Sequence, residues 1–323
     1  MPTTRALRPL RSARRTRGAA LLTAMIIVTL IVTLAASMVW QQWRAVQVET
    51  AERARMQSAW ILNGALDWAR LILREDARSG RPTALTEPWA TPLAEARLST
   101  FLAVDTSNAE DAPDAFLSGV ITDAQARYNL TNLVMQGNLV QSETDALDRL
   151  CQSAGVSSDV AARIARGLRD AETASTSAGT TDSPLRPRSV AQLSWLGIDA
   201  DSLERLAPYV VLLPVRTPVN INTASREVLA ATIKGLDLAT AERLVQTRQR
   251  DPFKTLKAVE DLLPGFGPLN PQQVALRSNF FVVRGRLRLE DRVLEQRSLV
   301  ERRELEMVVL QREQLSTRES SGS

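Results

Sequence analysis

The chain has 323 residues, a formal net charge of +4, no histidine and a single cysteine. The missing histidine excludes Ser-His-Asp and Cys-His catalysis and any histidine-ligated metal, and a lone cysteine cannot form a disulfide within the chain. The first 18 residues contain six arginines and no acid, so the remainder of the chain carries a net charge of −2. The composition therefore argues against an enzyme and against nucleic-acid binding driven by bulk positive charge.

The first predicted element is a membrane-spanning helix over residues 19–40. The run Ala19–Val39 carries no charge, follows an arginine-rich segment and precedes Trp40. At about 1.5 Å per residue, such a run just crosses a hydrocarbon core of roughly 30 Å, and the arginine side is expected to stay cytoplasmic. Apolar residues then recur at helical spacing to about Ser79, so we expect the same helix to leave the membrane as an amphipathic stem.

The N-terminus allows three kinds of processing. A secretory signal peptide would be cleaved near Ser37, an ordinary single-span anchor would keep Met1, and a cut after Gly18 would leave the apolar run at the new N-terminus.

The third arrangement resembles a type IV prepilin-like leader, in which a membrane peptidase cuts after the glycine and methylates the new terminus. The resemblance implies that Gly18 precedes the cut and that Ala19 is the methylated first residue. Most members carry Glu at the fifth mature position, whereas this chain has Thr23. The subclass that lacks this Glu is the K-type minor pseudopilin of type II secretion systems. A tip subunit has nothing above it to pair with a carboxylate, which would cost about 2.5–3.5 kcal/mol in hydrocarbon; a threonine hydroxyl can bond a carbonyl one turn back.

A second stretch carries the same resemblance. Strands are predicted at residues 98–104 and 116–122, and the chain then enters the run Asp123–Leu133. This run is similar to the K-type signature, although Ala126 replaces its glycine and Thr131 its second asparagine. The matching positions are Asp123, Gln125, Arg127, Asn129, Asn132 and Leu133. From the residues alone, the two asparagines are expected to satisfy backbone groups of a turn.

Residues 141–275 are predicted to be mainly helical. A motif within 218–230 supplies four more signature positions, with Asn222 or Thr223 as a helix cap and Glu227 as a capping-box acid. These four positions are Asn220, Asn222, Thr223 and Ala224. Helices follow at about 238–250 and 256–263. The layout resembles helix-hairpin-helix modules, some of which bind DNA, but Asp237 puts a negative charge where a phosphate would lie.

Two further features of this region are interpreted as follows. Cys151 lies on the apolar side of a helix beginning near Ser142 and is expected to be a small buried hydrophobe. The family resemblance associates calcium with an acidic loop, and here only Asp170, Glu172 and Asp182 surround the low-complexity stretch 173–183. Calcium needs six to eight oxygen ligands, so both a weak calcium site and a solvated loop stay open, and no cofactor is required.

Alternating residues predict three closing strands at 279–290, 293–301 and 304–312, with a bulge near Gly285. The predicted fold class is α+β. It is a type IV pilin-like fold whose long N-terminal helix packs on an antiparallel sheet, with a large helical insertion of helix-hairpin-helix or SAM-like type. The predicted segments are a leader (1–18), a span (19–40), a first pilin-like part (41–140), the helical insertion (141–275), closing strands (276–315) and a disordered tail (316–323).

The resemblance implies a minor pseudopilin at the tip of the type II secretion pseudopilus, in the bacterial inner membrane with the bulk of the chain periplasmic. It would initiate and cap filament assembly for protein export. Implied partners are the I-type, J-type and H-type minor pseudopilins, the assembly platform and the prepilin peptidase. Two alternatives stay open at this stage, namely an anchored DNA-binding protein of the DNA-uptake type and a secreted enzyme with a cleaved signal peptide.

Overall fold

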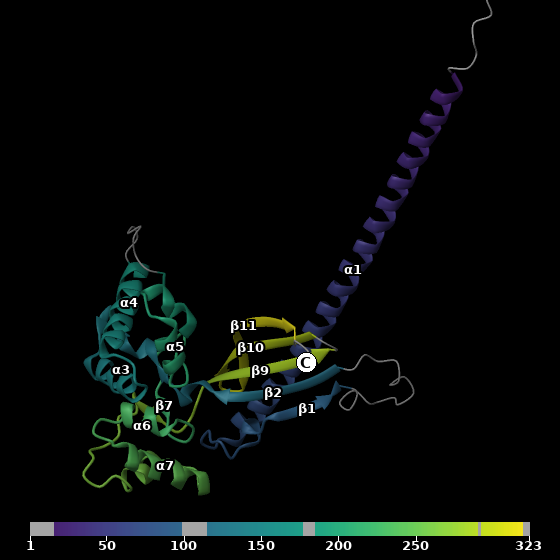
Figure 1. The fold of residues 1–323 in the computed structure, drawn as a ribbon. Coiled ribbons are helices and arrows are strands. Elements are labelled where there is room, and N and C mark those ends of the chain that lie inside the picture. Colours follow the sequence, from purple (N-terminus) through teal and green to yellow (C-terminus); the bar gives the residue numbers. More distant parts are fainter. Residues whose placement is uncertain (1–15, 99–114, 177–184, 290–291, 319–323) are drawn as a thin grey trace, which may run out of the picture. The chain divides into compact units, whose positions relative to one another are not determined.

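The computed structural model describes residues 16–98, 115–176, 185–289 and 292–318. The chain divides into two compact units, Met1–Trp60 and Ile61–Ser323. Helix α1, Thr16–Ser79, contributes to both of them (Figure 1).

The described part of the first unit is a single helix with an unburied apolar surface. Every side chain from Ala19 to Thr50 is exposed. Within the described residues, α1 is the one helix long and apolar enough to cross a membrane, with a mean hydropathy of 2.5 in its most apolar window. Apolar side chains left without a protein core are expected where lipid is the solvent.

The second unit is built on a five-stranded antiparallel sheet with the order β1-β2-β9-β10-β11 (Figure 1). The sheet strands are β1 (Leu93–Arg97), β2 (Ala115–Asp123), β9 (Phe280–Leu289), β10 (Arg292–Arg303) and β11 (Glu306–Arg318). Side chains alternate between the two faces of a strand, so every second residue of β9 faces α1. On that face Phe281 and Val283 pack with Leu66 and Leu73 of the helix.

Gly285 shows why α1 lies so close to the sheet. A bulge was predicted at this glycine, but β9 pairs continuously with β2 and β10 through it. A Cβ atom on Gly285 would lie 3.1 Å from a methyl carbon of Leu62. The prediction of a bulge was therefore wrong, and the glycine instead leaves room for the helix.

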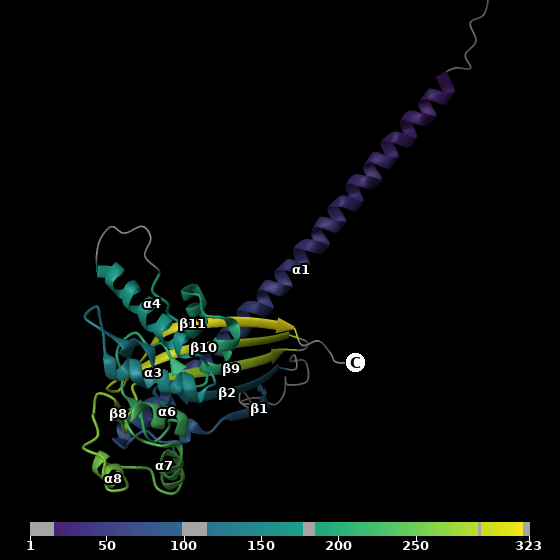
Figure 2. The ribbon, with the colours of Figure 1, turned by 60° about the vertical axis from the view of Figure 1, so that its left-hand side comes forward.

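A helical module is inserted between β2 and β9 and lies beside the end of the sheet where β2 ends (Figures 1 and 2). Its α-helices are α3 (Gln141–Ser153), α4 (Ser158–Thr176), α5 (Ala200–Leu206), α6 (Arg226–Thr232), α7 (Leu238–Arg250) and α8 (Leu256–Glu260). Two-residue strands tie its segments together: β3 (Tyr128–Asn129) pairs with β6 (Val210–Val211), β4 (Val134–Met135) with β5 (Asn138–Leu139), and β7 (Val219–Asn220) with β8 (Val274–Ala275). The 3₁₀ helices are η1 (Pro88–Ala90), η3 (Ala124–Ala126), η4 (Leu130–Leu133) and η5 (Val190–Leu196). The module has its own hydrophobic core, which includes Cys151 as predicted.

The α+β fold is confirmed, and several boundaries differ from the predictions. The predicted strand 98–104 lies almost wholly outside the described residues, and the structure places β1 at Leu93–Arg97. Strand β11 continues to Arg318, so the first three residues of the tail predicted to be disordered belong to the sheet. The rest of that tail lies outside the described residues.

Candidate assembly site

The membrane helix satisfies its own hydroxyl groups. Thr23 donates from Oγ1 to the carbonyl oxygens of Ala19 and Ala20, at 3.0 Å each. Thr29 and Thr33 make the same kind of bond to the carbonyl three residues back, at 2.9 Å. The apolar run therefore presents no unpaired hydroxyl, which is the arrangement that a hydrocarbon environment favours. Gly18 lies in the first turn of α1, and the rest of the predicted leader to residue 15 lies outside the described residues.

The two signature stretches meet around the carboxylate of Asp123, which is buried where β2 ends. Its Oδ1 accepts from the backbone N–H of Gln125 at 2.8 Å, and this bond caps the N-terminus of η3. Its Oδ2 accepts from Asn220 Nδ2 at 2.9 Å and from the hydroxyls of Thr223 and Ser278 at 2.6 Å each. Burial raises the pKa of Asp123, and these hydrogen bonds act in the opposite direction.

Gln125 and Asn220 extend this network to the neighbouring segments. The Gln125 side chain donates to the carbonyl of Pro218 at 2.9 Å and accepts from the N–H of Asn279 at 2.6 Å. Asn220 Nδ2 also lies 3.1 Å from the carbonyl oxygen of Thr83. The network therefore joins the loop after α1, the end of β2, the helical module and the start of β9.

Asn129 and Asn132 attach η4 to a distant segment of the chain. Asn129 accepts from the N–H of Thr131 at 3.1 Å, the local turn bond that the sequence predicts. It also accepts from the N–H of Leu213 at 3.1 Å and donates to the carbonyl of Val215 at 2.8 Å. Asn132 exchanges two bonds with the backbone of Thr217, at 2.9 and 3.0 Å. Leu133, the last signature position here, is fully buried in the core of the module.

In the motif at 218–230, the residue that caps the helix differs from the predicted one. Helix α6 is capped by Ser225, whose hydroxyl accepts from the N–H of Val228 at 3.4 Å. The prediction that Asn222 or Thr223 caps this helix was therefore wrong. The Asn222 side chain instead donates to the carbonyl of Phe253 and accepts from its N–H, at 2.9 Å each. The Thr223 hydroxyl donates to Asp123. Ala224 is fully buried in the core of the module.

Sequence reasoning missed three members of these networks. Thr83, Thr217 and Ser278 are all buried and hydrogen-bonded to signature residues, Thr83 through its backbone carbonyl. Each is a single small polar residue outside any recognisable motif. Burial of a polar side chain, which only the fold reveals, is the signal that would have found them.

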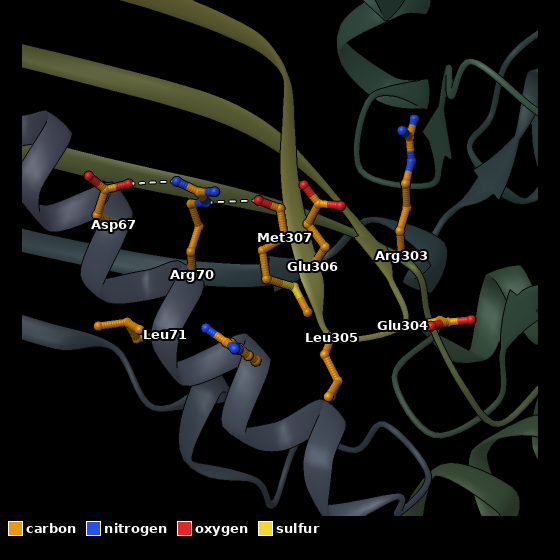
Figure 3. Close-up of a pocket in the computed structure, with 9 residues that line it drawn as sticks. Asp67, Arg70, Leu71, Arg303, Glu304, Leu305, Glu306 and Met307 are labelled. Carbon is orange, nitrogen blue, oxygen red and sulfur yellow. Dashed lines mark hydrogen bonds and ion pairs between the residues drawn. The ribbon is translucent and has the colours of Figure 1, made fainter.

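A groove of about 760 Å³ lies between α1 and the turn that joins β10 to β11 (Figure 3). Arg70 crosses it, with Nε donating to the carbonyl of Met307 at 2.8 Å and Nη1 pairing with Asp67 at 2.7 Å. Leu71 and Leu305 line the groove with exposed side chains, as Figure 3 shows. Acidic and basic side chains are mixed along its walls, and it contains no recognisable catalytic arrangement.

The hairpins of the module do not form a phosphate-binding site in the described structure. Asp237 caps α7 by accepting from the N–H of Thr240 at 2.8 Å, so its carboxylate occupies the place that a phosphate would take. Gly265 has a φ of +89°, but within the described residues no helix follows it before β9. The geometry favours a structural role for both turns.

The predicted calcium ligands are not brought together among the described residues. Asp170 in α4 is bound to Arg169 Nε at 3.0 Å and Nη2 at 2.8 Å. Glu172 lies on the same helix, and Asp182 lies outside the described residues. Within the part of the chain that the structure describes, no group of three or more His, Cys, Asp or Glu side chains is placed to hold a metal.

Comparisons with known proteins identify the family. Family models described as type II secretion system (T2SS), protein K, match residues 126–215 and 219–277. The type II secretion system protein K of Pectobacterium carotovorum subsp. carotovorum is 30% identical over 332 residues, covering 93% of this chain and 96% of that protein. The chain belongs to the type II secretion system protein K family. The protein K of Pseudomonas aeruginosa is also similar, at 26% identity over 75% of each chain.

A solved structure confirms the fold of this chain. A crystal structure of the GspK-GspI-GspJ complex from the enterotoxigenic Escherichia coli type 2 secretion system matches with a TM-score of 0.62 and 20% identity, covering 83% of this chain and 99% of that chain. As a member of the protein K family, the chain is a minor pseudopilin of type II secretion. Its N-terminal apolar helix fits a membrane anchor. The family is a structural component of the secretion system.

Proposed function

We propose that this chain occupies the tip of the pseudopilus and initiates and caps its assembly. The bulk of the chain would lie in the periplasm, and α1 would cross the inner membrane with its arginine-rich end in the cytoplasm. In this role the chain carries out no chemistry and needs no resident cofactor.

Thr23 is the observation that carries the tip position. A carboxylate at this depth needs a neighbouring cation, and a terminal subunit has none above it. An unpaired acid costs about 2.5–3.5 kcal/mol at the centre of a membrane helix, and part of this cost at position 23, which lies nearer the end of the span. Thr23 instead closes its hydroxyl onto Ala19 and Ala20 within its own helix, so it makes no demand on a neighbour.

The helical module supports the same position. It has its own hydrophobic core and occupies the whole interval between β2 and β9. Repeated along a helical filament, an insertion of this size would have to fit between stacked subunits. At the end of a filament nothing is stacked on one side, so the bulk is tolerated there.

The proposed partners are other minor pseudopilins of the I and J types, and the H type next to them. Support comes from the solved relative, which is described as a complex of GspK with GspI and GspJ. The inner-membrane assembly platform and the prepilin peptidase would act on the chain before assembly. Peptidase cleavage after Gly18 would leave Ala19 as the methylated N-terminus.

The first test is the intact mass and N-terminal sequence of the protein recovered from its native membrane. We expect a chain that starts at Ala19 and carries one methyl group. A start at Met1 would contradict prepilin-type processing, and a start near Ser37 would contradict the membrane anchor itself.

The tip position is tested by changing the fifth mature residue. Thr23→Glu should lower secretion and the number of pseudopili per cell, because it adds an unpaired acid, whereas Thr23→Ser keeps the hydroxyl and should match the native protein. Gold-labelled antibody against the module should mark filament ends. Labelling along the filament shaft, with full secretion by Thr23→Glu, would contradict the proposal.

A cofactor-free role has its own test. Thermal unfolding of the full chain in detergent should give the same midpoint with EDTA and with millimolar calcium. A midpoint raised by calcium, and lowered again by Asp170→Asn or Asp182→Asn, would instead establish a calcium site at the low-complexity stretch.

A further inference from the structure

Arg44 is the only charged side chain between residues 19 and 48. It lies on α1, five residues after the uncharged run Ala19–Val39 ends. When that run fills the hydrocarbon core, Arg44 stands about 7.5 Å beyond it, at about 1.5 Å per helical residue. A bilayer has a headgroup layer of about 5–7.5 Å on each side of the core. The spacing therefore puts Arg44 at the depth of the lipid headgroups.

The two arginines that flank the uncharged run are spaced for the two surfaces of one bilayer. Arg17, in the first turn of α1, precedes Arg44 by 27 positions. Along a helix this is about 40 Å, and a bilayer with its headgroups is about 40–45 Å thick. Each end of the run therefore meets a headgroup layer at an arginine.

Two tryptophans share the face of α1 that carries Arg44. Trp43 and Arg44 follow Trp40 by three and four positions, so both are its neighbours on the helix surface. The indole side chains of Trp40 and Trp43 are 59% and 61% exposed. The guanidinium carbon of Arg44 lies 5.6 Å from the centre of the Trp40 ring. Trp40 is one turn nearer the membrane, so the Arg44 side chain is directed back toward the lipid.

This face of α1 offers Arg44 no carboxylate. The first acidic residue after the run is Glu49, nine positions beyond Trp40 and therefore on the opposite side of the helix. Glu49 is also engaged already, by Arg53 at 2.7 Å. Arginines are normally concentrated at the cytoplasmic end of a span, where this chain has six of them before Gly18. An arginine at the other end calls for an anionic partner from outside the chain.

A phospholipid phosphate is the anion that lies at this depth. The guanidinium group is a flat fork of donors that matches phosphate oxygens with two parallel hydrogen bonds, and it stays charged at any physiological pH. Indole rings favour the same boundary, because the ring is apolar and its N–H can donate to a polar headgroup. The three side chains therefore suit one lipid headgroup.

We propose that Arg44, held over Trp40 and flanked by Trp43, binds the phosphate of a phospholipid in the leaflet opposite the arginine-rich end. This inference rests on the proposed function, because it takes the topology in which α1 crosses the inner membrane. The bound lipid would fix the depth of α1 in the bilayer, and so hold the bond after Gly18 at the other membrane surface. A bilayer lipid is chosen over a free phosphate ion because two exposed indoles lie beside the cation.

The test is native mass spectrometry of the chain recovered from its native membrane and reconstituted in nanodiscs of phosphatidylethanolamine and phosphatidylglycerol. Phospholipid should stay bound to the native chain after its release from the nanodisc. Arg44→Gln should retain about fivefold less, the change expected for one cation at a membrane surface. Trp40→Leu should also lower retention, whereas Arg44→Lys keeps the charge without the fork and should lose less.

Arg55→Gln is the matched control. Arg55 is an exposed arginine on the same helix, about 24 Å beyond the end of the uncharged run and so outside the headgroup layer. Its variant should retain as much phospholipid as the native chain. An equal loss in Arg55→Gln and Arg44→Gln would mean a general effect of charge and would overturn the site.

The outcomes separate the two proposals. If alkaline carbonate releases the chain from its native membrane, the anchor in the proposed function fails. If the chain is inserted and Arg44→Gln retains as much phospholipid as the native chain, the lipid site is wrong while the proposed function stands. Binding of inorganic phosphate to the chain in lipid-free detergent, lost in Arg44→Gln, would overturn the choice of a lipid as the ligand.

Discussion

The sheet is joined to α1 and to the helical module by two buried polar contacts of opposite kinds. Near the end of α1, Asp76 pairs with Arg302 of β10 at 2.5 Å, and both side chains are nearly buried. At the module, Asp123 is held by neutral donors only. The first contact leaves Asp76 Oδ1 and Arg302 Nε without a hydrogen-bond partner, whereas both oxygens of Asp123 are satisfied.

The contact with α1 therefore depends on a pair of opposite charges, whereas the contact with the helical module depends on a complete set of hydrogen bonds from neutral donors. Arg302 also lies over the ring of Phe281 at 4.8 Å, and Trp89 meets that ring edge-on at 5.4 Å, so aromatic packing surrounds the ion pair. A buried pair with incomplete hydrogen bonding contributes little net stability while intact, yet it is costly to break on one side. A fully bonded neutral network fixes geometry without an opposite charge nearby.

The largest expected effect comes from breaking the ion pair on one side. Asp76→Ala should lower the free energy of unfolding by about 4 kcal/mol, because it leaves a buried guanidinium group uncompensated. Replacing both partners, as in Asp76→Leu with Arg302→Met, should recover most of that loss. Urea unfolding of the full chain in detergent measures both. A double variant as unstable as the single one would show that the pair itself is stabilising.

A smaller loss is expected at the module junction. Asp123→Ala should lower the free energy of unfolding by about 3 kcal/mol, since it leaves the buried donors of Asn220, Thr223 and Ser278 without their shared acceptor. Asp123→Asn keeps one oxygen and should lose less. Limited proteolysis should then cut the links between β2 and the module more quickly. Equal stability of all three proteins would contradict the role of this carboxylate.

The stability that Asp123 contributes should depend on pH. Burial raises the pKa of Asp123 above its ordinary value of 3.8, so between these two values the folded chain holds a proton that the unfolded chain releases. Stability from this group therefore increases as the pH falls through that interval, and is lost as the pH rises above the raised pKa. The gap in unfolding free energy between the native chain and Asp123→Asn should widen on acidification. A gap that narrows would mean that the hydrogen bonds outweigh burial.

The smallest expected effect is local to the module. Ser225→Ala removes the side-chain cap of α6 and should cost about 1 kcal/mol. Asn222→Ala should cost more, because its two bonds to Phe253 hold α7 against the motif. Comparing the two variants by thermal unfolding checks the assignment of the cap. A Ser225→Ala variant as stable as the native chain would contradict the assignment of Ser225 as the cap.

The elements that sequence reasoning predicted well are those fixed by local periodicity. The long helix, α7 at Leu238–Arg250 and the late strands follow from spacing that the chain imposes on itself. The signature positions were recognisable as a motif, yet their contacts were not. Asn129 and Thr217 are separated by 88 positions, and no local pattern records that pairing. The same limit explains the missed role of Gly285, whose small size matters only because Leu62 arrives from another element.

The two ends of the helical module are paired with each other in the sheet. Asp123, where the chain leaves β2, lies directly opposite Phe281, where it has just entered β9. The entry and exit of the module are therefore neighbours in a ladder, and in topology the whole module is the loop of a β-hairpin. Loop-closure entropy grows only with the logarithm of loop length, so lengthening such a loop disturbs the sheet little. The pilin-like domain therefore accommodates the whole module in place of one hairpin turn. Replacing the module with a short turn should leave the pairing of β2 with β9 intact.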